Sequence, residues 1–291
     1  MHTVRDYRRT LEKWVRLIGD VDTGELSADH VRRFLYHLRI EEALAPKTVK
    51  NAWIGLSAFF TWLEGEMGVE HVIRRYRIKM PAAGSREVVP LSKTDLRSLL
   101  TACERTAVWK STKRAPATTQ RSTRLRDQAI VLVLVDTGIR ASELCDLVTG
   151  DVDLKTGATQ VRAGKGDKGR TVYLGNAAKD AVWRYLSKRQ GLRQDDPLFA
   201  TSQRQPMDRN ALRKMLAAAG ERAEIVEPVT PHRLRHTFAI SYLRNGGDVY
   251  TLQRLLGHSS MGMVRRYLAL AQTDIAEAHR RASPADNWRL G

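Results

Sequence analysis

The chain has 291 residues, enough for two domains of ordinary size that each bury a hydrophobic core. Its 49 Lys and Arg residues against 32 Asp and Glu residues give a formal charge of +17, which favours binding to polyanions. Two cysteines, a charged N-terminus and no apolar run longer than residues 129–135 exclude disulfide-rich, secreted and membrane-spanning proteins. The expected location is the reducing cytoplasm.

Residues 1–80 are expected to form an all-helical domain. Apolar residues recur at helical spacing in three stretches, the second of which is capped by Ser27 and the third followed by Gly65. These stretches are residues 4–18, 31–38 and 49–63. On the outer face of the third helix, Lys47 and Lys50 have two interpretations, a solvated surface or a contact with DNA phosphates.

A linker is expected at residues 81–90, and a second domain at 91–291 with a C-terminal tail at 273–291. Ser92 and Asp95 have the spacing of a capping box at the first helix of this domain. Residues 105–126 then include seven basic residues, no acidic residue and little apolar surface, which predicts a mobile basic loop. Arg114 and Arg121 are its candidate DNA contacts.

The second domain is expected to be mainly α with a small antiparallel β-sheet, an α+β fold. The apolar segment 127–135 ends at Thr137–Gly138, which suits a helix that terminates in a left-handed residue. Three short segments with alternating residues or flanking glycines predict the sheet, and Lys165 and Lys168 lie in its last turn. These segments are residues 152–154, 158–163 and 170–174. Most of the remaining sequence is helical, and one helix begins at Thr230–Pro231.

Several residues of this domain carry groups suited to phosphate chemistry. His232 and Arg235 are three apart in the first turn of a predicted helix, where the backbone N–H groups and the helix dipole already attract anions. Arg140 opens a short helix and has Glu143 three residues on as a possible brace. A tyrosine such as Tyr267 becomes a usable nucleophile when positive charge stabilises its phenolate. Each of these signals, taken alone, is better explained by a surface or core residue.

Five motifs nevertheless occur together and in a fixed order. They are TGIRASEL at 137–144, GKGDKGR at 164–170, HRLRHTFA at 232–239, LLGHS at 255–259, and Tyr267. In this combination the chain resembles the tyrosine recombinases, also called phage integrases, over roughly residues 88–271. The N-terminal half is similar, more loosely, to the core-binding domain of that family. The resemblance implies a DNA-clamping domain followed by a catalytic domain, of the simpler Xer-like type that acts on short inverted core sites.

The resemblance also implies the central chemistry. Arg140 and Arg235 would grip the non-bridging oxygens of the scissile phosphate and neutralise the charge that builds up in the transition state. Tyr267 would attack the phosphorus, which leaves a 3′-phosphotyrosyl bond and a free 5′-hydroxyl. Neither a metal nor another cofactor is implied, because fixed cations replace the metal and the covalent ester conserves the energy of the broken bond.

Three further residues receive supporting roles from the resemblance. Lys165 would protonate the departing oxygen, and its preference over Lys168 in the same turn rests on the Gly-Lys-Gly match. His232 would act as an acid or base, and His258 would hydrogen-bond the phosphate. His236 is expected to project from a different face of its helix and to be structural.

The partners implied are double-stranded DNA with inverted core sites, three further protomers in a homo-tetramer, and accessory proteins, with no membrane. In that tetramer the tail at 273–291, which carries Trp288 and Leu290, would dock on a neighbouring protomer. Two other functions are weighed beside recombination: a type IB topoisomerase, which would relax supercoils without a specific site, and a non-catalytic DNA-binding regulator. The target sequence, and the choice between integration, excision and resolution, stay open.

Overall fold

The computed structural model describes residues 2–84, 89–107, 109–111, 114–162, 169–201, 203–257, 261–271, 279–280 and 283–288. By their internal contacts the residues group into two compact units, 1–87 and 88–291. Within the described ranges, no helix is both long enough and apolar enough to cross a bilayer.

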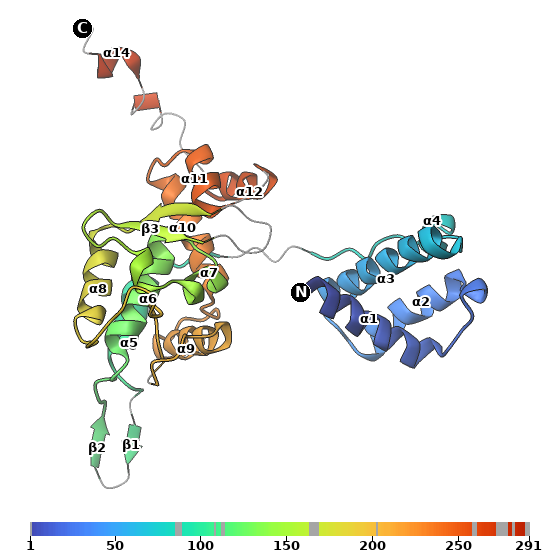
Figure 1. The fold of residues 1–291 in the computed structure, drawn as a ribbon, viewed down its shortest axis with the longest axis horizontal. Helices are drawn as coiled ribbons and strands as arrows, with labels where there is room; N and C mark the ends of the chain where they lie inside the picture. The colour runs from blue at the N-terminus through green and yellow to red at the C-terminus, as the bar shows by residue number, and fades with distance from the viewer. Residues whose placement is uncertain are drawn as a thin grey trace. The chain divides into compact units, whose positions relative to one another are not determined.

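The first unit is built from helices (Figure 1), and their buried core includes Trp14, Phe34 and Phe60. Its elements are α1 (His2–Ile18), η1 (Thr23–Glu25), α2 (Ala28–Tyr36), η2 (His37–Glu41), α3 (Pro46–Met67) and α4 (Val72–Arg75). Trp14 of α1 packs edge-on against Phe34 of α2 and Phe60 of α3, with ring centroids 5.3 and 6.3 Å away. Ser27 caps α2 as predicted, since its hydroxyl accepts from the backbone N–H of His30. One tryptophan therefore joins the three main helices.

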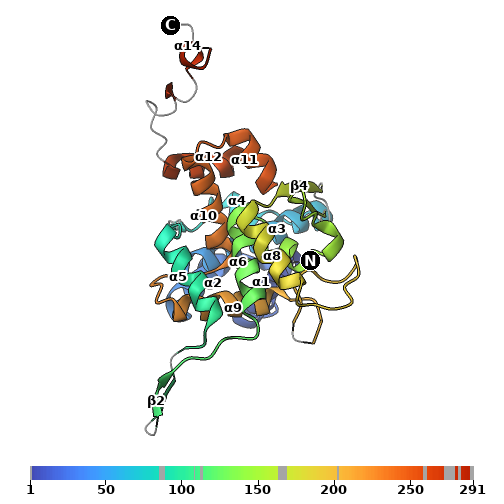
Figure 2. The same ribbon diagram turned by 90° about the vertical axis from the view of Figure 1, so that its left-hand side faces the viewer.

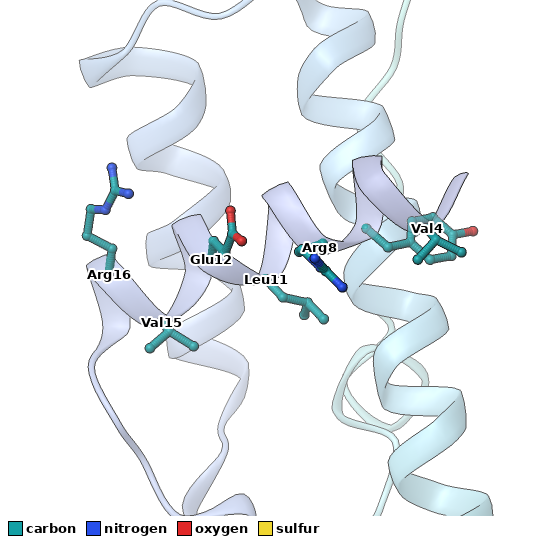
Figure 3. A pocket seen from close by; sticks show the side chains of 7 residues that line it. Val4, Arg8, Leu11, Glu12, Val15 and Arg16 are labelled. Carbon is teal, nitrogen blue, oxygen red and sulfur yellow. The ribbon is translucent and has the colours of Figure 1, made fainter. Parts of the chain in front are cut away.

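Two details of this unit differ from the sequence-based expectation. Helix α3 continues past Gly65 and ends at Gly68, whose φ of 66° provides the left-handed cap. On α1, Val4 and Val15 are exposed, and with Leu11 they line a pocket on the outer side of the helix (Figure 3). The reason is geometric: Trp14 points into the core, and Val15 follows it about 100° further round the helix.

The second unit is mostly helical and is arranged around α6 (Figures 1 and 2). Its helices are α5 (Lys93–Glu104), α6 (Arg124–Thr137), α7 (Ala141–Asp146), η3 (Thr149–Asp151), α8 (Asn176–Leu186), α9 (Arg209–Arg222), α10 (Pro231–Arg244), α11 (Val249–Leu256), α12 (Met261–Ala271) and α14 (Pro284–Asn287). Helix α6 packs against α5, α8 and α10, so it is apolar on nearly all sides. It ends at Gly138, with φ of 60°, as predicted.

The predicted small antiparallel sheet is confirmed. Strands β3 (Ala158–Val161) and β4 (Arg170–Tyr173) pair in register, and Val161 lies opposite Arg170. The expected strand at 152–154 is reduced to a single bridge between Val152 and Thr159. The α+β class predicted from the sequence therefore holds.

The basic segment 105–126 is not the unstructured loop that its composition suggested. It contains a hairpin of β1 (Trp109–Ser111) and β2 (Arg114–Ala117), which extends away from the helices of its unit in both views (Figures 1 and 2). Arg105 and Gln120 form an antiparallel bridge between the hairpin and the helices. The two segments that lead to the hairpin are therefore also paired. Main-chain hydrogen bonds order this segment without the apolar surface that the prediction had treated as necessary.

Helix α10 is hydrogen-bonded to residues 89–91, near the start of the second unit. The Nε of Arg233 donates to the carbonyl of Val89 at 2.9 Å, and the hydroxyl of Thr237 accepts from the N–H of Leu91 at 2.9 Å. A further guanidinium nitrogen of Arg233 donates to the carbonyl of Glu227. Both Arg233 and Thr237 are buried. These bonds hold the first two turns of α10 in place.

The end of α6 gives a direct test of this packing. A Cβ at Gly138 would lie 2.3 Å from the ring of Phe238, in addition to its strained φ. Gly138→Ala is expected to lower the free energy of unfolding by about 2–4 kcal/mol, measured by urea denaturation. The control is Gly191→Ala, with a φ of 67° and open space around its Cβ, for which about 1 kcal/mol is expected. Equal losses in the two variants would contradict the contact with Phe238.

Candidate active site

Three arginine side chains meet at the C-terminal end of α11. The Nε of Arg170 donates to the carbonyl of Leu255 at 2.6 Å, Arg235 donates to that of Leu256 at 2.7 Å, and Arg140 donates to that of Gly257 at 2.9 Å. The last carbonyls of a helix have no intrahelical partner and carry the negative end of its dipole, so they attract cations. Residues from β4, α10 and the start of α7 thus converge on three consecutive carbonyls.

Arg235 is the most deeply buried of these arginines, with 5% of its surface exposed. A second nitrogen of its guanidinium donates to the carbonyl of Gly138 at 2.7 Å, so the group is fixed from two sides. Burial and the nearby charge of Arg140 lower the pKa of Arg235 to about 10. Arg235 therefore remains a cation at neutral pH, and an anion that binds beside it would stabilise its buried positive charge.

Glu143 places one negative charge between two of the arginines. Its carboxylate accepts from the guanidinium and the backbone N–H of Arg140, at 2.8 and 2.6 Å, and from both terminal nitrogens of Arg170, at 2.9 and 2.8 Å. Burial alone would raise the pKa of Glu143, but the hydrogen bonds from Arg170 and Arg140 outweigh it and lower the pKa to about 2. The predicted brace between Arg140 and Glu143 is present, and Arg170 is an additional member that the sequence did not reveal.

Two histidines and a tyrosine form a continuous contact beside the arginines. The Nε2 atoms of His232 and His236 are 2.8 Å apart, and the ring of His236 meets that of Tyr267 edge-on at 5.1 Å. The prediction that His236 points away from His232 is wrong. Residues four apart on a helix are only about 40° apart around its axis and share a face. The i, i+4 spacing in the sequence was the signal that could have found this contact.

His236 stays neutral at physiological pH. Burial, together with the charges of His232 and Arg235, lowers the pKa of His236 to about 4. Its Nδ1 is buried and has no hydrogen-bond partner, so the bond to His232 is the polar contact of this ring. A neutral imidazole in this position links the exposed His232 to Tyr267 without adding a charge.

Tyr267 is buried, with 4% of its surface exposed. Helix α12, which carries it, packs against α10, and Tyr267 belongs to an apolar cluster that includes Phe238, Leu256 and Val264. The phenol therefore lies at the boundary between this cluster and the histidine pair. Arg140 and Arg235 meet at the end of α11, and His232 of α10 and Tyr267 of α12 lie beside them.

The other candidate residues are placed differently. Lys165, Lys168 and His258, and the side chain of Arg114, lie outside the described residues. Lys47 is exposed and Lys50 half-buried at the start of α3 in the first unit. Arg121 has a structural partner, because it donates to the buried carboxylate of Asp127 at 3.1 Å, which Arg126 also contacts. The DNA contacts of all these residues stay predictions.

Other reactive groups of the described residues lie in less suitable surroundings. Burial raises the pKa of the Cys103 thiol to about 12 and that of Cys145 to about 11, so both are protonated and unreactive at neutral pH. Within the same residues there is no cluster of three or more His, Cys, Asp or Glu side chains that could hold a metal ion.

Comparison with known proteins agrees with this geometry. Residues 89–274 match the phage integrase family, and residues 1–67 match its N-terminal SAM-like domain. The tyrosine recombinase XerC of Thermodesulfovibrio yellowstonii is 30% identical, over 97% of this chain and 90% of the relative. The tyrosine recombinase XerA of Thermococcus kodakarensis is 32% identical, over 97% and 89%. The crystal structure of XerH bound to a palindromic difH substrate, 21% identical, has the same fold, with a TM-score of 0.73 over 97% of this chain and 80% of that one.

The chain belongs to the phage integrase family and is a site-specific recombinase of the tyrosine type. The family match covers every element that contributes to the convergence at the end of α11.

The charge of Glu143 gives a prediction with a defined pH dependence. Glu143→Gln leaves the charges of Arg140 and Arg170 uncompensated and is expected to lower the free energy of unfolding by about 3 kcal/mol at pH 7. A carboxylate with a lowered pKa stabilises the fold above its ordinary pKa of 4.5, and this stability is lost as the pH falls toward 2. Urea denaturation should show a constant difference between wild type and variant from pH 8 to 5, and a smaller one at pH 3. A difference that is unchanged at pH 3 would refute the ion pair.

Proposed function

We propose that this recombinase cuts and rejoins DNA strands through a 3′-phosphotyrosyl intermediate and a Holliday junction, in integration, excision or resolution. The observation that carries the proposal is the convergence of Arg140 and Arg235 on the end of α11, beside the helix of Tyr267. Guanidinium groups that are already oriented can stabilise the charge of a pentacoordinate phosphorus transition state without reorganisation during the reaction.

The proposed cleavage step is a transesterification. The phenolic oxygen of Tyr267 attacks the scissile phosphorus, the bond from phosphorus to the 5′-oxygen breaks, and Lys165 gives that oxygen a proton. His232, as a base, takes the proton of the phenol and, as an acid, returns it on rejoining, and His258 donates a hydrogen bond to the phosphate. Rejoining reverses these steps with the 5′-hydroxyl of the partner strand. Because Tyr267 is buried, it must become accessible before it attacks.

The nucleophile is tested with a nicked suicide substrate that carries the core site. Wild type is expected to form a protein–DNA adduct that resists denaturant, and Tyr267→Phe to form none, because it lacks the attacking oxygen. Tyr242→Phe on α10 is the control and should retain the adduct. An adduct that persists in Tyr267→Phe would assign the nucleophile to another of the eight tyrosines.

The first unit is proposed to clamp the DNA that the second unit, the catalytic unit, cleaves. Lys47, with its exposed side chain, and Lys50 lie near the start of α3 and would contact backbone phosphates. In the second unit Arg114, Arg121 and Lys168 are the proposed contacts. The match of residues 1–67 to the N-terminal domain of phage integrases supports this division of roles.

Recombination is proposed to take place in a tetramer on two inverted-site duplexes, in which the C-terminal tail of one protomer docks on the next. Two features support this assembly. Trp288, which follows α14, is 70% exposed. The catalytic unit also has a largely apolar cavity of about 890 Å³, whose walls include Leu91, Val172 and Phe238. A tail with an exposed tryptophan is a suitable occupant for such a cavity.

Deletion of residues 274–291 tests the tail. One protomer should still bind a half-site with the affinity of wild type, because the DNA contacts are proposed elsewhere. Cooperative binding to the full site should fall at least tenfold, as measured by gel shift across half-site and full-site DNA. Full cooperativity in the truncated protein would exclude docking in trans.

A further inference from the structure

The two histidines of α10 share one hydrogen bond. The Nε2 atoms of His232 and His236 are 2.8 Å apart, and the two rings stand at 87° to each other. A hydrogen bond between two imidazole nitrogens holds one proton, so one ring donates and the other accepts. The direction of this bond decides which nitrogen of His232 carries the lone pair, because the hydrogen bond at one ring nitrogen sets the protonation of the other.

The surroundings of His236 keep its ring neutral. The charges that act on it are those of His232 and Arg235 on its own helix, and the phenol ring of Tyr267 lies against it from α12. Burial, and then these two positive charges, lower the pKa of His236 to about 4. When His232 is protonated, His236 is therefore the neutral partner of the pair.

The protonated state of His232 fixes the direction of the bond. An imidazolium carries a proton on both nitrogens, so Nε2 of His232 then donates and Nε2 of neutral His236 accepts. The same direction suits neutral His232 when its proton stays on Nε2 and its lone pair is on Nδ1. With the opposite direction the bond would have to reverse, and His236 would have to exchange its Nε2 proton for one on Nδ1, each time His232 takes up a proton.

We propose that His236 is a positioning residue that accepts from Nε2 of His232 and so directs the proton transfers of His232 to Nδ1. His232 then keeps one hydrogen bond and one ring orientation throughout the reaction. As the phenolic oxygen of Tyr267 bonds to phosphorus and the bond to the 5′-oxygen breaks, the phenol proton passes to Nδ1 of His232, and it returns on rejoining. This inference rests on the proposed role of His232 as the base of cleavage and the acid of rejoining.

The cost of this arrangement is located on His236. Its Nδ1 atom carries the second proton of the pair, and within the described part of the chain this atom is buried and has no hydrogen-bond partner. Buried polar groups without partners are rare in native structures. The unpaired N–H at Nδ1 of His236 is therefore a distinctive mark of the proposed bond, and it can be observed directly.

Nitrogen-15 NMR of the full chain with labelled histidine reads the direction of the bond. The chain has eight histidines, and the variants His232→Gln and His236→Gln assign the signals of the pair. At a pH where both rings are neutral, the proton of His232 is expected on Nε2 and that of His236 on Nδ1. A proton on Nε2 of His236 would overturn the inference, whatever the activity of the protein.

Two substitutions of His236 separate the hydrogen bond from the packing against Tyr267. Phenylalanine keeps an aromatic ring but cannot accept from His232, whereas the amide oxygen of glutamine can accept and does not titrate. A general base contributes about 10²–10⁴-fold to rate, and a misplaced base loses part of this. Adduct formation on a nicked suicide substrate should therefore fall about 10–100-fold in His236→Phe and less than about threefold in His236→Gln.

The pH dependence of adduct formation distinguishes a positioning role from a structural one. In His236→Phe the pH of half-maximal rate should fall, because no neutral acceptor stabilises the His232 cation, and in His236→Gln it should stay close to that of wild type. Val264→Ala is the packing control, since Val264 is buried on α12 in the same apolar cluster as Tyr267. It should lower stability toward urea without moving this pH, and an equal shift in Val264→Ala would overturn the inference.

A double variant shows whether His236 acts through His232. In the His232→Ala background, His236→Phe should cost less than about twofold in adduct formation, because the residue it positions is already gone. A loss as large as in the wild-type background would assign His236 to the packing of Tyr267 and overturn the inference. If His232→Ala alone reacts at the rate of wild type, the proposed acid–base role of His232 fails and the role of His236 with it, while cleavage by Tyr267 still stands.

Discussion

The arrangement of the catalytic unit depends on the carboxyl end of α11, where backbone carbonyls take hydrogen bonds from arginines of three other elements. Arginine side chains are long and lose considerable conformational entropy when they are fixed. Here the fixing is done during folding, by carbonyl groups that a helix end leaves unpaired. The guanidiniums of Arg140 and Arg235 are consequently ordered by the protein itself, so the phosphate that they are proposed to bind would not have to order them.

Three guanidiniums in a small volume repel one another, and burial increases the effect because it removes water. Burial first, and then the charge of Arg140, lower the pKa of Arg235 to about 10. Glu143 supplies one negative charge against the three, so a net positive charge remains. In the proposed reaction a bound phosphate would relieve this imbalance, most strongly in the transition state, where its charge is greatest.

Much of the fold is visible in the sequence, because it follows from local patterns. The caps at Ser27 and Thr230, the glycine that ends α6 and the brace between Arg140 and Glu143 are all formed by residues within a few positions of one another. The convergence on α11 could not be predicted, since its partners are separated by up to 117 residues along the chain. Carbonyl acceptors also have no signature in a sequence, because every residue has one.

Two expectations differ from the structure. The side-chain composition of residues 105–126 predicts a mobile loop, whereas the order of this segment comes from backbone pairing in the β1–β2 hairpin. His236 lies one turn after His232 on the same face of α10, so its ring contacts that of His232 instead of projecting from a different face. Backbone pairing has no signature in composition, whereas the contact between the two histidines follows from their i, i+4 spacing.

The attachment of α10 to the start of the second unit has a mechanical consequence. Arg233 lies between His232 and Arg235 in the first turn of the helix, and it grips the backbone at Val89, where the connecting chain arrives. A force on the connecting chain therefore acts on the same helical turn that carries His232 and Arg235. Tension between the two units would act first on the turn that carries His232 and Arg235, the residues proposed to contact the phosphate.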